Sequence, residues 1–121
     1  MDPRHELRVK IIQQLFALSF AKGKIGLKDN KTKEIIKNAS KINDYIKKYA
    51  PKYPIDKIAK VDLAILQLAV YELMIENKQP AKVIIDEAVE LAKELGSDKA
   101  YAFVNAVMGK IYSKSKSQKY K

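Results

Sequence analysis

The residues with the clearest chemical potential are carboxylates that recur at helical spacing. Asp86, Glu90 and Glu94 follow one another at intervals of four residues, so on a helix they share one face. A divalent cation would also need ligands from a second element. Lys82 and Lys93 stand beside these acids in the sequence, and a solvated acidic face paired with lysines is the favoured interpretation. The pattern therefore predicts no metal site.

Motifs of catalysis are missing from the chain. His5 is the only histidine, and no acidic residue stands at a spacing typical of a general base or metal site, so we interpret it as an ordinary surface residue. There is no cysteine, which excludes a thiolate metal site, a cysteine nucleophile and a disulfide. The sequence also lacks a glycine-rich phosphate loop, a nucleophile elbow and a dinucleotide fingerprint. We expect a protein that is not an enzyme and that needs no cofactor.

Basic and aromatic residues do occur together, and this combination holds single-stranded RNA through its phosphates and its unstacked bases. Arg4, Arg8 and Phe16 belong to one predicted helix, where Arg8 and Phe16, eight positions apart, are near enough in angle to share a face. Lys99 and Phe103 are i,i+4 neighbours at the start of another helix, where free backbone N–H groups favour phosphate. The alternative for each phenylalanine is a place in the core.

Charge is unevenly distributed along the chain. The net charge is +10, and residues 1–60 hold 15 Lys or Arg against 6 Asp or Glu. Residues 61–112 hold 5 against 8, and the last nine residues hold 4 against none. A basic half can attract a polyanion by releasing its counterions, which favours a nucleic acid as partner. The alternative is that the lysines only keep a small helical protein soluble.

Length and composition describe one soluble globular domain. The chain has 121 residues, of which 47% are hydrophobic and 31% charged, enough apolar side chains to form a core. No apolar run approaches the roughly 20 residues that cross a bilayer, and the N-terminus lacks the apolar segment of a signal peptide. We therefore expect a cytoplasmic protein that does not bind membranes.

Apolar residues recur at helical spacing and predict a single all-α domain over residues 1–112. The run 61–75 is the most apolar and should lie at the centre. A loop at 22–30 and a basic, flexible tail at 113–121 are expected outside the helices. The predicted helices span 3–21, 31–49, a short turn at 55–59, 61–75, 81–95 and a last helix up to 112.

Two local signals mark the start of the last helix. Gly96 follows the helix 81–95 and is expected to end it in a left-handed conformation. Ser97 or Asp98 is then expected to cap the helix that follows.

The second half of the chain resembles a known family. The run VDLAILQLAVYELMIENKQPAKVIIDEAVELAKELGSDKAYAFVNAVMGKIY is similar to the C-terminal half of the NusB family of transcription antitermination factors, with YEL, EAVELAK and FVN as the strongest matches. RVKIIQQLFALSF resembles the first helix of that family and INDYIKKYAPKYPIDKIA its middle region, whereas residues 22–38 look abbreviated. The resemblance implies a small, all-helical, non-enzymatic RNA-binding protein.

The resemblance also implies partners. Members of the family bind single-stranded boxA RNA together with the ribosomal protein NusE, and support rRNA synthesis by the transcription elongation complex. Asp62 matches an acidic position beside the NusE contact, and its alternative role is a helix N-cap. The acidic second half would then supply the protein-partner face. The RNA-binding candidates are Arg4, Arg8, Phe16, Lys99 and Phe103.

Departures from the family pattern leave alternatives open. Gln67 stands where Arg is common and Ala102 where Lys is common, so two potential phosphate contacts are lost. One alternative is an RNA-binding module related to the N-terminal domain of rRNA cytosine methyltransferases, although this chain has neither their cysteines nor room for their large catalytic domain. Another is a scaffold or homodimer that binds only protein.

Overall fold

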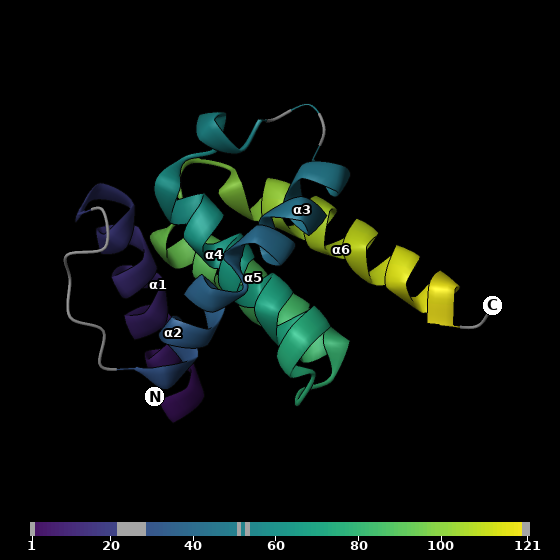
Figure 1. Ribbon diagram of the computed structural model, residues 1–121, viewed down its shortest axis with the longest axis horizontal. Helices are drawn as coiled ribbons and strands as arrows, with labels where there is room; N and C mark the ends of the chain where they lie inside the picture. The colour runs from purple at the N-terminus through teal and green to yellow at the C-terminus, as the bar shows by residue number, and fades with distance from the viewer. Residues whose placement is uncertain (1, 22–28, 51, 53, 120–121) are drawn as a thin grey trace.

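The computed structural model describes residues 2–21, 29–50, 52 and 54–119 of the chain (Figure 1). These described residues form helices and no strand, so the prediction of an all-α fold is confirmed. No helix among them has the length and apolar character needed to cross a membrane. Of the predicted 22–30 loop, residues 22–28 lie outside the described part. The elements are α1 (Pro3–Ala21), α2 (Asn30–Lys37), α3 (Ala39–Tyr49), the 3₁₀ turn η1 (Ile55–Lys57), α4 (Lys60–Val70), the π-helical segment η2 (Tyr71–Glu76), α5 (Ala81–Leu95) and α6 (Ala100–Lys119).

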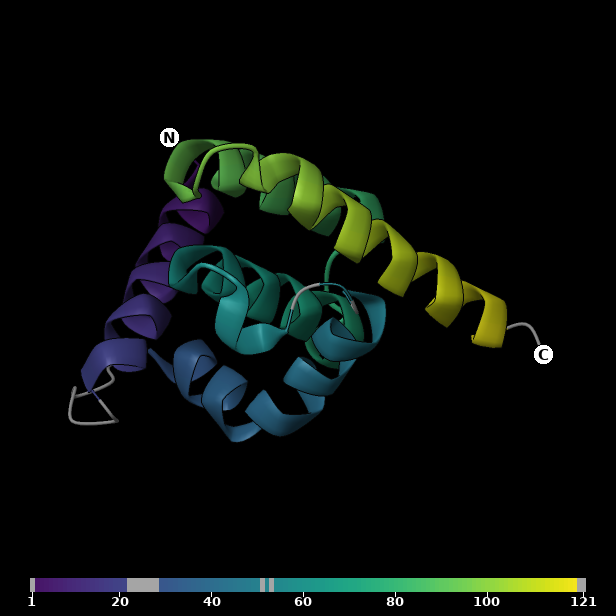
Figure 2. The same ribbon diagram turned by 90° about the horizontal axis from the view of Figure 1, so that it is seen from above.

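Helix α4 is the centre of the molecule. It contacts α1, α3, α5 and α6, and Figure 2 shows it between α5 and α6 on one side and α2 and α3 on the other. Ile65, Leu66 and Val70 are fully buried, as expected for a helix whose surface is apolar on almost every side. The predicted position of the apolar run at the centre is confirmed.

The apolar run does not continue as one regular helix. It passes from α4 into η2, where Tyr71, Glu72 and Leu73 are buried in succession. A π turn adds a residue to the helical turn and so changes which side chains face inward. Asn77 then takes a left-handed conformation (φ 55°) and ends the segment.

Asn38 divides the predicted 31–49 helix into α2 and α3, so the prediction of a single helix is wrong. The backbone of Asn38 leaves helical geometry (φ −101°, ψ 14°), and its side-chain amide donates to the carbonyl of Glu34 at 2.8 Å. Such local side-chain hydrogen bonds compete with the helix. Asp29 caps the start of α2 by accepting from the backbone N–H of Lys31 at 2.8 Å.

The turn between α5 and α6 also differs from expectation. Gly96 is extended (φ −78°, ψ 174°), and Lys99 is the residue with left-handed geometry (φ 63°). Glycine is needed at position 96 for space, because an added Cβ would lie 2.6 Å from the carbonyl oxygen of Ala92. Neither predicted cap forms: the Ser97 hydroxyl donates to Asp62, and no side-chain hydrogen bond of Asp98 is found in the described region.

Helix α6 extends beyond the predicted end at residue 112. It continues to Lys119, and its C-terminal turns project past the other helices (Figures 1 and 2). Residues 113–119 therefore have helical backbone, and the flexibility expected of the 113–121 tail stays a prediction.

Candidate nucleic-acid interface

A surface hollow of about 370 Å³ lies between η1, the start of α4 and the turn into α6. It gathers three of the residues singled out in the sequence: Lys99 and Phe103, expected to bind RNA, and Asp62, expected to bind a protein. Lys57 adds a second cation. The sequence had linked Lys99 to Phe103 by helical spacing, but Asp62 reaches them only through the fold. The hollow is lined by Lys57, Ile58, Ala59, Asp62, Ser97, Asp98, Lys99, Ala100 and Phe103.

Asp62 holds one wall of the hollow in place. Its side chain is buried, and it accepts hydrogen bonds from the backbone N–H of Ser97 at 3.1 Å and from the Ser97 hydroxyl at 2.5 Å. Asp62 lies in the first turn of α4, whose N-cap is Ala59, so it is not the cap that the sequence offered as an alternative. The carboxylate fixes the turn that carries Lys99.

Lys99 reaches the rim of the hollow through a backbone conformation that lysine seldom adopts. A non-glycine residue with positive φ persists only where its surroundings enforce it, and here the Asp62–Ser97 hydrogen bonds lie two residues away. The side chain of Lys99 is exposed. Phe103, in the first turn of α6, is half-buried. A cation and an aromatic ring therefore line the same opening.

Phe16 lies outside the hollow, in an aromatic pair near the C-terminal end of α1. Its ring packs edge-on against Phe20 at a centroid distance of 5.0 Å, and the two residues are 39% and 61% exposed. The ammonium group of Lys60 lies 5.1 Å from the centre of the Phe20 ring. Lys60 is the first residue of α4, and it comes directly after Ala59, which lines the hollow. The aromatic pair and the hollow are therefore both adjacent to the first turn of α4.

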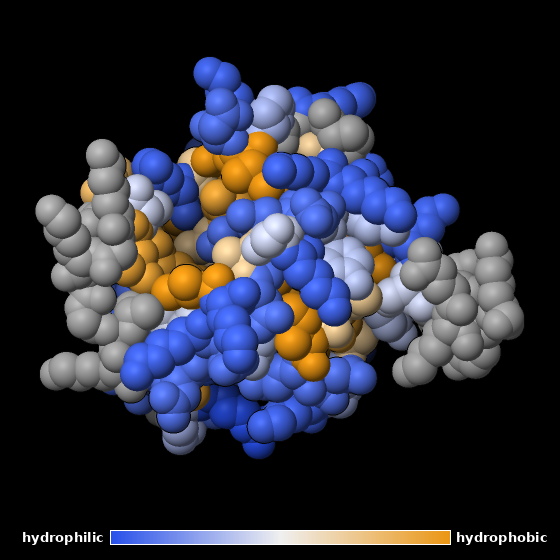
Figure 3. Space-filling view, viewed as in Figure 1, coloured by the Kyte–Doolittle hydropathy of each residue, from blue (hydrophilic) through white to orange (hydrophobic). Residues whose placement is uncertain are grey.

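An apolar groove of about 210 Å³ opens beside this pair. Figure 3 shows the apolar surface between α1 and α2. The wall includes Gln67, whose amide donates to Asn43 of α3 at 3.1 Å, at the position where the family commonly has Arg. The groove is lined by Leu15, Leu18, Ser19, Ile35, Ile36, Ala39, Lys60, Leu63 and Gln67.

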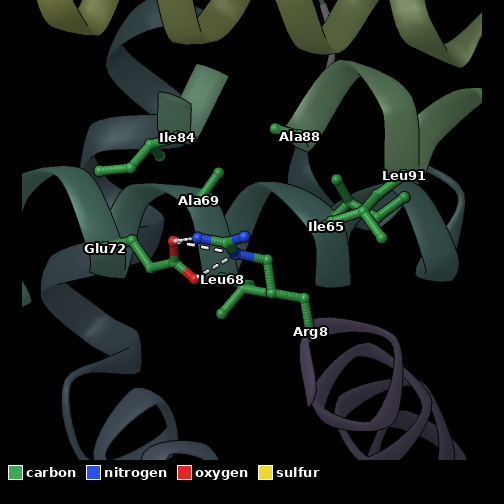
Figure 4. Close-up of a pocket in the computed structure, with 8 residues that line it drawn as sticks. All are labelled: Arg8, Ile65, Leu68, Ala69, Glu72, Ile84, Ala88 and Leu91. Carbon is green, nitrogen blue, oxygen red and sulfur yellow. Dashed lines mark hydrogen bonds and ion pairs between the residues drawn. The ribbon is translucent and has the colours of Figure 1, made fainter. Parts of the chain in front are cut away.

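Arg8 is buried, which the sequence did not indicate. Its guanidinium donates to both carboxylate oxygens of Glu72, with Nε–Oε2 at 3.0 Å and the terminal nitrogen to Oε1 at 2.9 Å (Figure 4). Burial acts to lower the pKa of Arg8, but the hydrogen bonds and charge of Glu72 raise it above its usual value. Lys31 donates to the same carboxylate at 3.1 Å. Phe16, predicted to share a face with Arg8, is exposed where Arg8 is not.

Arg4 is exposed at the N-terminal end of α1. Its guanidinium donates to the side-chain carbonyl of Gln79 at 3.3 Å, a neutral partner before α5. Neither Arg4 nor Arg8 lines the hollow that holds Lys99 and Phe103. The RNA-binding candidates from the sequence therefore occupy separate places on the molecule.

His5 is not an ordinary surface residue. Its Nδ1 is within hydrogen-bonding distance of Glu87, and its Nε2 lies 2.8 Å from a carboxylate oxygen of Glu94. The hydrogen bond with Glu87 is the main reason that the pKa of His5 is raised above 6.5. The pair joins α1 to α5 across 82 and 89 residues of sequence, too far apart for any local motif to show.

The rest of the acidic face on α5 pairs as predicted. Lys82 contacts Asp86 at 3.1 Å and Lys93 contacts Glu90 at 3.6 Å. Within the described part of the chain, no group of three His, Asp or Glu side chains is placed to hold a metal ion.

The chain is similar in sequence to curated NusB proteins. The chain is 46% identical over 79 residues to the transcription antitermination protein NusB of Clostridium tetani, a match covering 65% of this chain and 52% of that protein. It is 45% identical over 82 residues to NusB of Agathobacter rectalis, covering 68% and 63%. The chain thus matches between one half and two thirds of the length of these curated relatives.

The fold agrees over a longer span. The structure superposes on that of T. maritima NusB with a TM-score of 0.79 and 33% identity, covering 91% of this chain and 90% of the other. The sequence pattern of the NusB family matches residues 6–113. That family consists of non-enzymatic factors, in agreement with the missing catalytic motifs. The chain belongs to the NusB family.

Proposed function

We propose that this chain is a transcription antitermination factor that binds single-stranded, boxA-type RNA at the hollow between η1, α4 and α6. The observation that carries the proposal is the convergence of Lys57, Lys99 and Phe103 on one opening. The names of the matched relatives, all transcription antitermination proteins, favour this function over that of a methyltransferase module.

The chemistry of the hollow suits an RNA strand. An unstacked base gains affinity by lying on an aromatic ring, and the phosphates beside it need cations. Phe103 offers the ring and the two lysines offer the charge. The hydrogen bonds between Asp62 and Ser97 fix the backbone before α6, so the site is formed before the RNA arrives and less ordering entropy is lost on binding.

The other RNA-binding candidates take different roles in this proposal. Arg4 is exposed, its guanidinium has Gln79 as a neutral partner, and it contacts a phosphate further along the strand. Arg8 stabilises the fold through Glu72 and does not contact RNA. Phe16 lies outside the RNA site, in the aromatic pair near the apolar groove, and its exposure of 39% lets either a base or a protein side chain reach it.

A protein partner, the ribosomal protein NusE in the family, would cover the apolar groove beside α1 and α2. An apolar groove with exposed aromatic residues at its edge is typical of a protein interface. Asp62 would act on this assembly by positioning the turn before Lys99, because its carboxylate is buried and already bonded to Ser97. The acidic second half is not the contact surface in this arrangement.

RNA titration with purified protein tests the proposal. Fluorescence anisotropy would compare a boxA-like RNA with a scrambled one, with and without NusE. Phe103→Leu keeps apolar bulk but removes the stacking face, and should weaken boxA binding by roughly 1 to 3 kcal/mol. Lys110→Gln, an exposed change elsewhere on α6, is the matched control.

Two outcomes would contradict the proposal. Equal affinity of the folded wild type for both RNAs, even with NusE, would rule out selective RNA binding and favour a protein-only scaffold or homodimer. Unchanged boxA affinity in Phe103→Leu would place the RNA elsewhere on the surface. Circular dichroism melting of each variant confirms that it is folded.

A further inference from the structure

The exposed lysines of α2 and α3 form a second charged surface, which we call the α2–α3 lysine face. Their ammonium groups make no hydrogen bond or ion pair with another side chain in the described residues, and one of them, Lys48, lies 5.5 Å from the centre of the Tyr49 ring. Glu34 and Asp44 are the only acids between residues 30 and 49. Figure 3 shows hydrophilic side chains over α2 and α3. The face consists of Lys33, Lys37, Lys41, Lys47 and Lys48.

The acids elsewhere do not offset this charge, because they are already paired. Every acidic residue in 61–112 except Asp98 contacts a cation, a histidine or a serine of the same chain. These contacts remove most of the negative charge that could otherwise neutralise the surface. Within the described residues, the lysines of α2 and α3 therefore keep a positive charge that these acids do not pair with.

The lysines are arranged in rows. Lys33 and Lys37 are i,i+4 neighbours on α2, and Lys41 and Lys48 lie two turns apart on one side of α3, about 10 Å along its axis. Helix α3 contacts η1, and η1 carries Lys57 at the edge of the RNA hollow. The helices that carry the lysines are therefore joined to the hollow through the contacts of α2 with α3 and of α3 with η1.

We propose that the α2–α3 lysine face binds the sugar–phosphate backbone of RNA that continues beyond the hollow, without reading its sequence. The proposal rests on the proposed function, since it takes the hollow as the place where the RNA is anchored. Flexible ammonium groups with no fixed acidic partner suit phosphates of any sequence. The same cations could attract an anionic membrane, but Ile35, Ile42 and Ile46 of these helices are buried. Ile36, at 40% exposure, leaves only a small apolar area beside the lysines to enter lipid.

Two triple variants with the same net charge test the proposal. In the first, Lys37, Lys41 and Lys48 are each replaced by Gln, which keeps a polar side chain and removes the charge. The matched control replaces three other exposed lysines by Gln: Lys10 on α1, Lys78 before α5 and Lys110 on α6. Each is titrated with a short boxA-like RNA and with the same RNA lengthened by about ten unrelated nucleotides at either end, over a range of salt concentrations.

The expected result is a length-dependent effect. The wild type and the control should bind the longer RNA more tightly and with a steeper salt dependence than the short one. The triple variant of the lysine face should bind the short RNA as the wild type does, but should not bind the longer RNA more tightly. For three lost phosphate contacts, the slope of log affinity against log salt concentration on the longer RNA should fall by roughly two.

Equal behaviour of the two triple variants on the longer RNA would overturn the proposal. In a parallel vesicle-binding experiment, the proposal would also be overturned if the lysine-face variant lost binding to phosphatidylserine vesicles while its RNA affinity showed no effect of RNA length. Failure of the proposed function gives a different result, because the wild type would then not prefer the short boxA-like RNA over its scrambled form. Melting curves confirm that all variants are folded.

Discussion

The buried pair between Arg8 and Glu72 makes a prediction that separates structure from RNA binding. Glu72 is 2% exposed and Arg8 7%, and the carboxylate binds Lys31 as well as the guanidinium. Glu72→Gln keeps the shape of the side chain and removes its charge, which leaves Arg8 buried beside a neutral amide. Breaking a buried ion pair in this way costs about 3 to 5 kcal/mol.

Replacing Arg8 and replacing Glu72 should not lower the free energy of unfolding by the same amount. Without Glu72, the nearest carboxylate to Arg8 is Glu87, at 3.9 Å, too far for a hydrogen bond. Without Arg8, the carboxylate of Glu72 keeps Lys31 at 3.1 Å. Arg8→Met should therefore cost less than Glu72→Gln, near or below 3 kcal/mol. The double variant should recover part of the loss, because it leaves no buried charge unpaired.

Urea unfolding followed by circular dichroism measures these free energies, and RNA titration of the same proteins measures binding. The expected outcome is lower stability with unchanged RNA affinity for whatever fraction is folded. The reasoning is refuted if Arg8→Met leaves the unfolding midpoint unchanged and weakens boxA binding. That outcome would mean that Arg8 leaves Glu72 to bind phosphate.

Three further predictions concern the core, the α6 turn and the α1–α5 contact. Leu66→Ala should cost about 2 to 5 kcal/mol in urea unfolding, because it leaves a cavity in the central helix, and a negligible loss would contradict the packing around α4. Asp62→Ala should cost about 1 to 3 kcal/mol by leaving Ser97 without its acceptor, whereas Asp62→Asn should leave affinity for NusE unchanged in calorimetric titration. Because the folded-state pKa of His5 is raised, its contribution to stability is present below pH 6.5 and is lost as pH rises through that raised value. Melting curves of the wild type and His5→Gln should therefore differ most at low pH, where His5 is charged. A difference in melting temperature that does not change with pH would contradict the charged contact.

Local signals predicted most of the helices. The bounds of α1 and α5 agree with the sequence, because each has a regular apolar stripe and a helix-breaking residue at one end. Asn38 was missed since its neighbours keep the apolar period on both sides, and only its amide hydrogen bond to Glu34 shows the break. Gly96 was assigned to the wrong conformation because glycine is required there for space, beside the Ala92 carbonyl and the carboxylate of Asp62. The contact with Asp62 is tertiary, and no local signal shows it.

The candidate site could be predicted only where it is local. Lys99 and Phe103 do line one hollow, but Lys99 lies in the turn before α6 with left-handed geometry, so the helical face predicted for the two residues does not form. Arg8 was grouped with Phe16 by the same reasoning, but its burial depends on Glu72, 64 residues away. A charged residue in a helical pattern gives no sign of whether a distant partner exists, so long-range ion pairs were beyond the reach of the sequence.

In the part of the chain that the structure describes, some basic side chains are bonded to acids and others are not. This difference explains how the chain could bind RNA despite its departures from the family pattern. Gln67 and Ala102 replace basic residues, and the amide of Gln67 is bonded to Asn43 of α3, so neither position offers a cation. Arg8 is also withdrawn into the core by Glu72. In the proposed function, the affinity for phosphate comes from cations without an acidic partner among the described residues. Lys57 and Lys99 at the hollow have that property, as do the lysines of the α2–α3 lysine face.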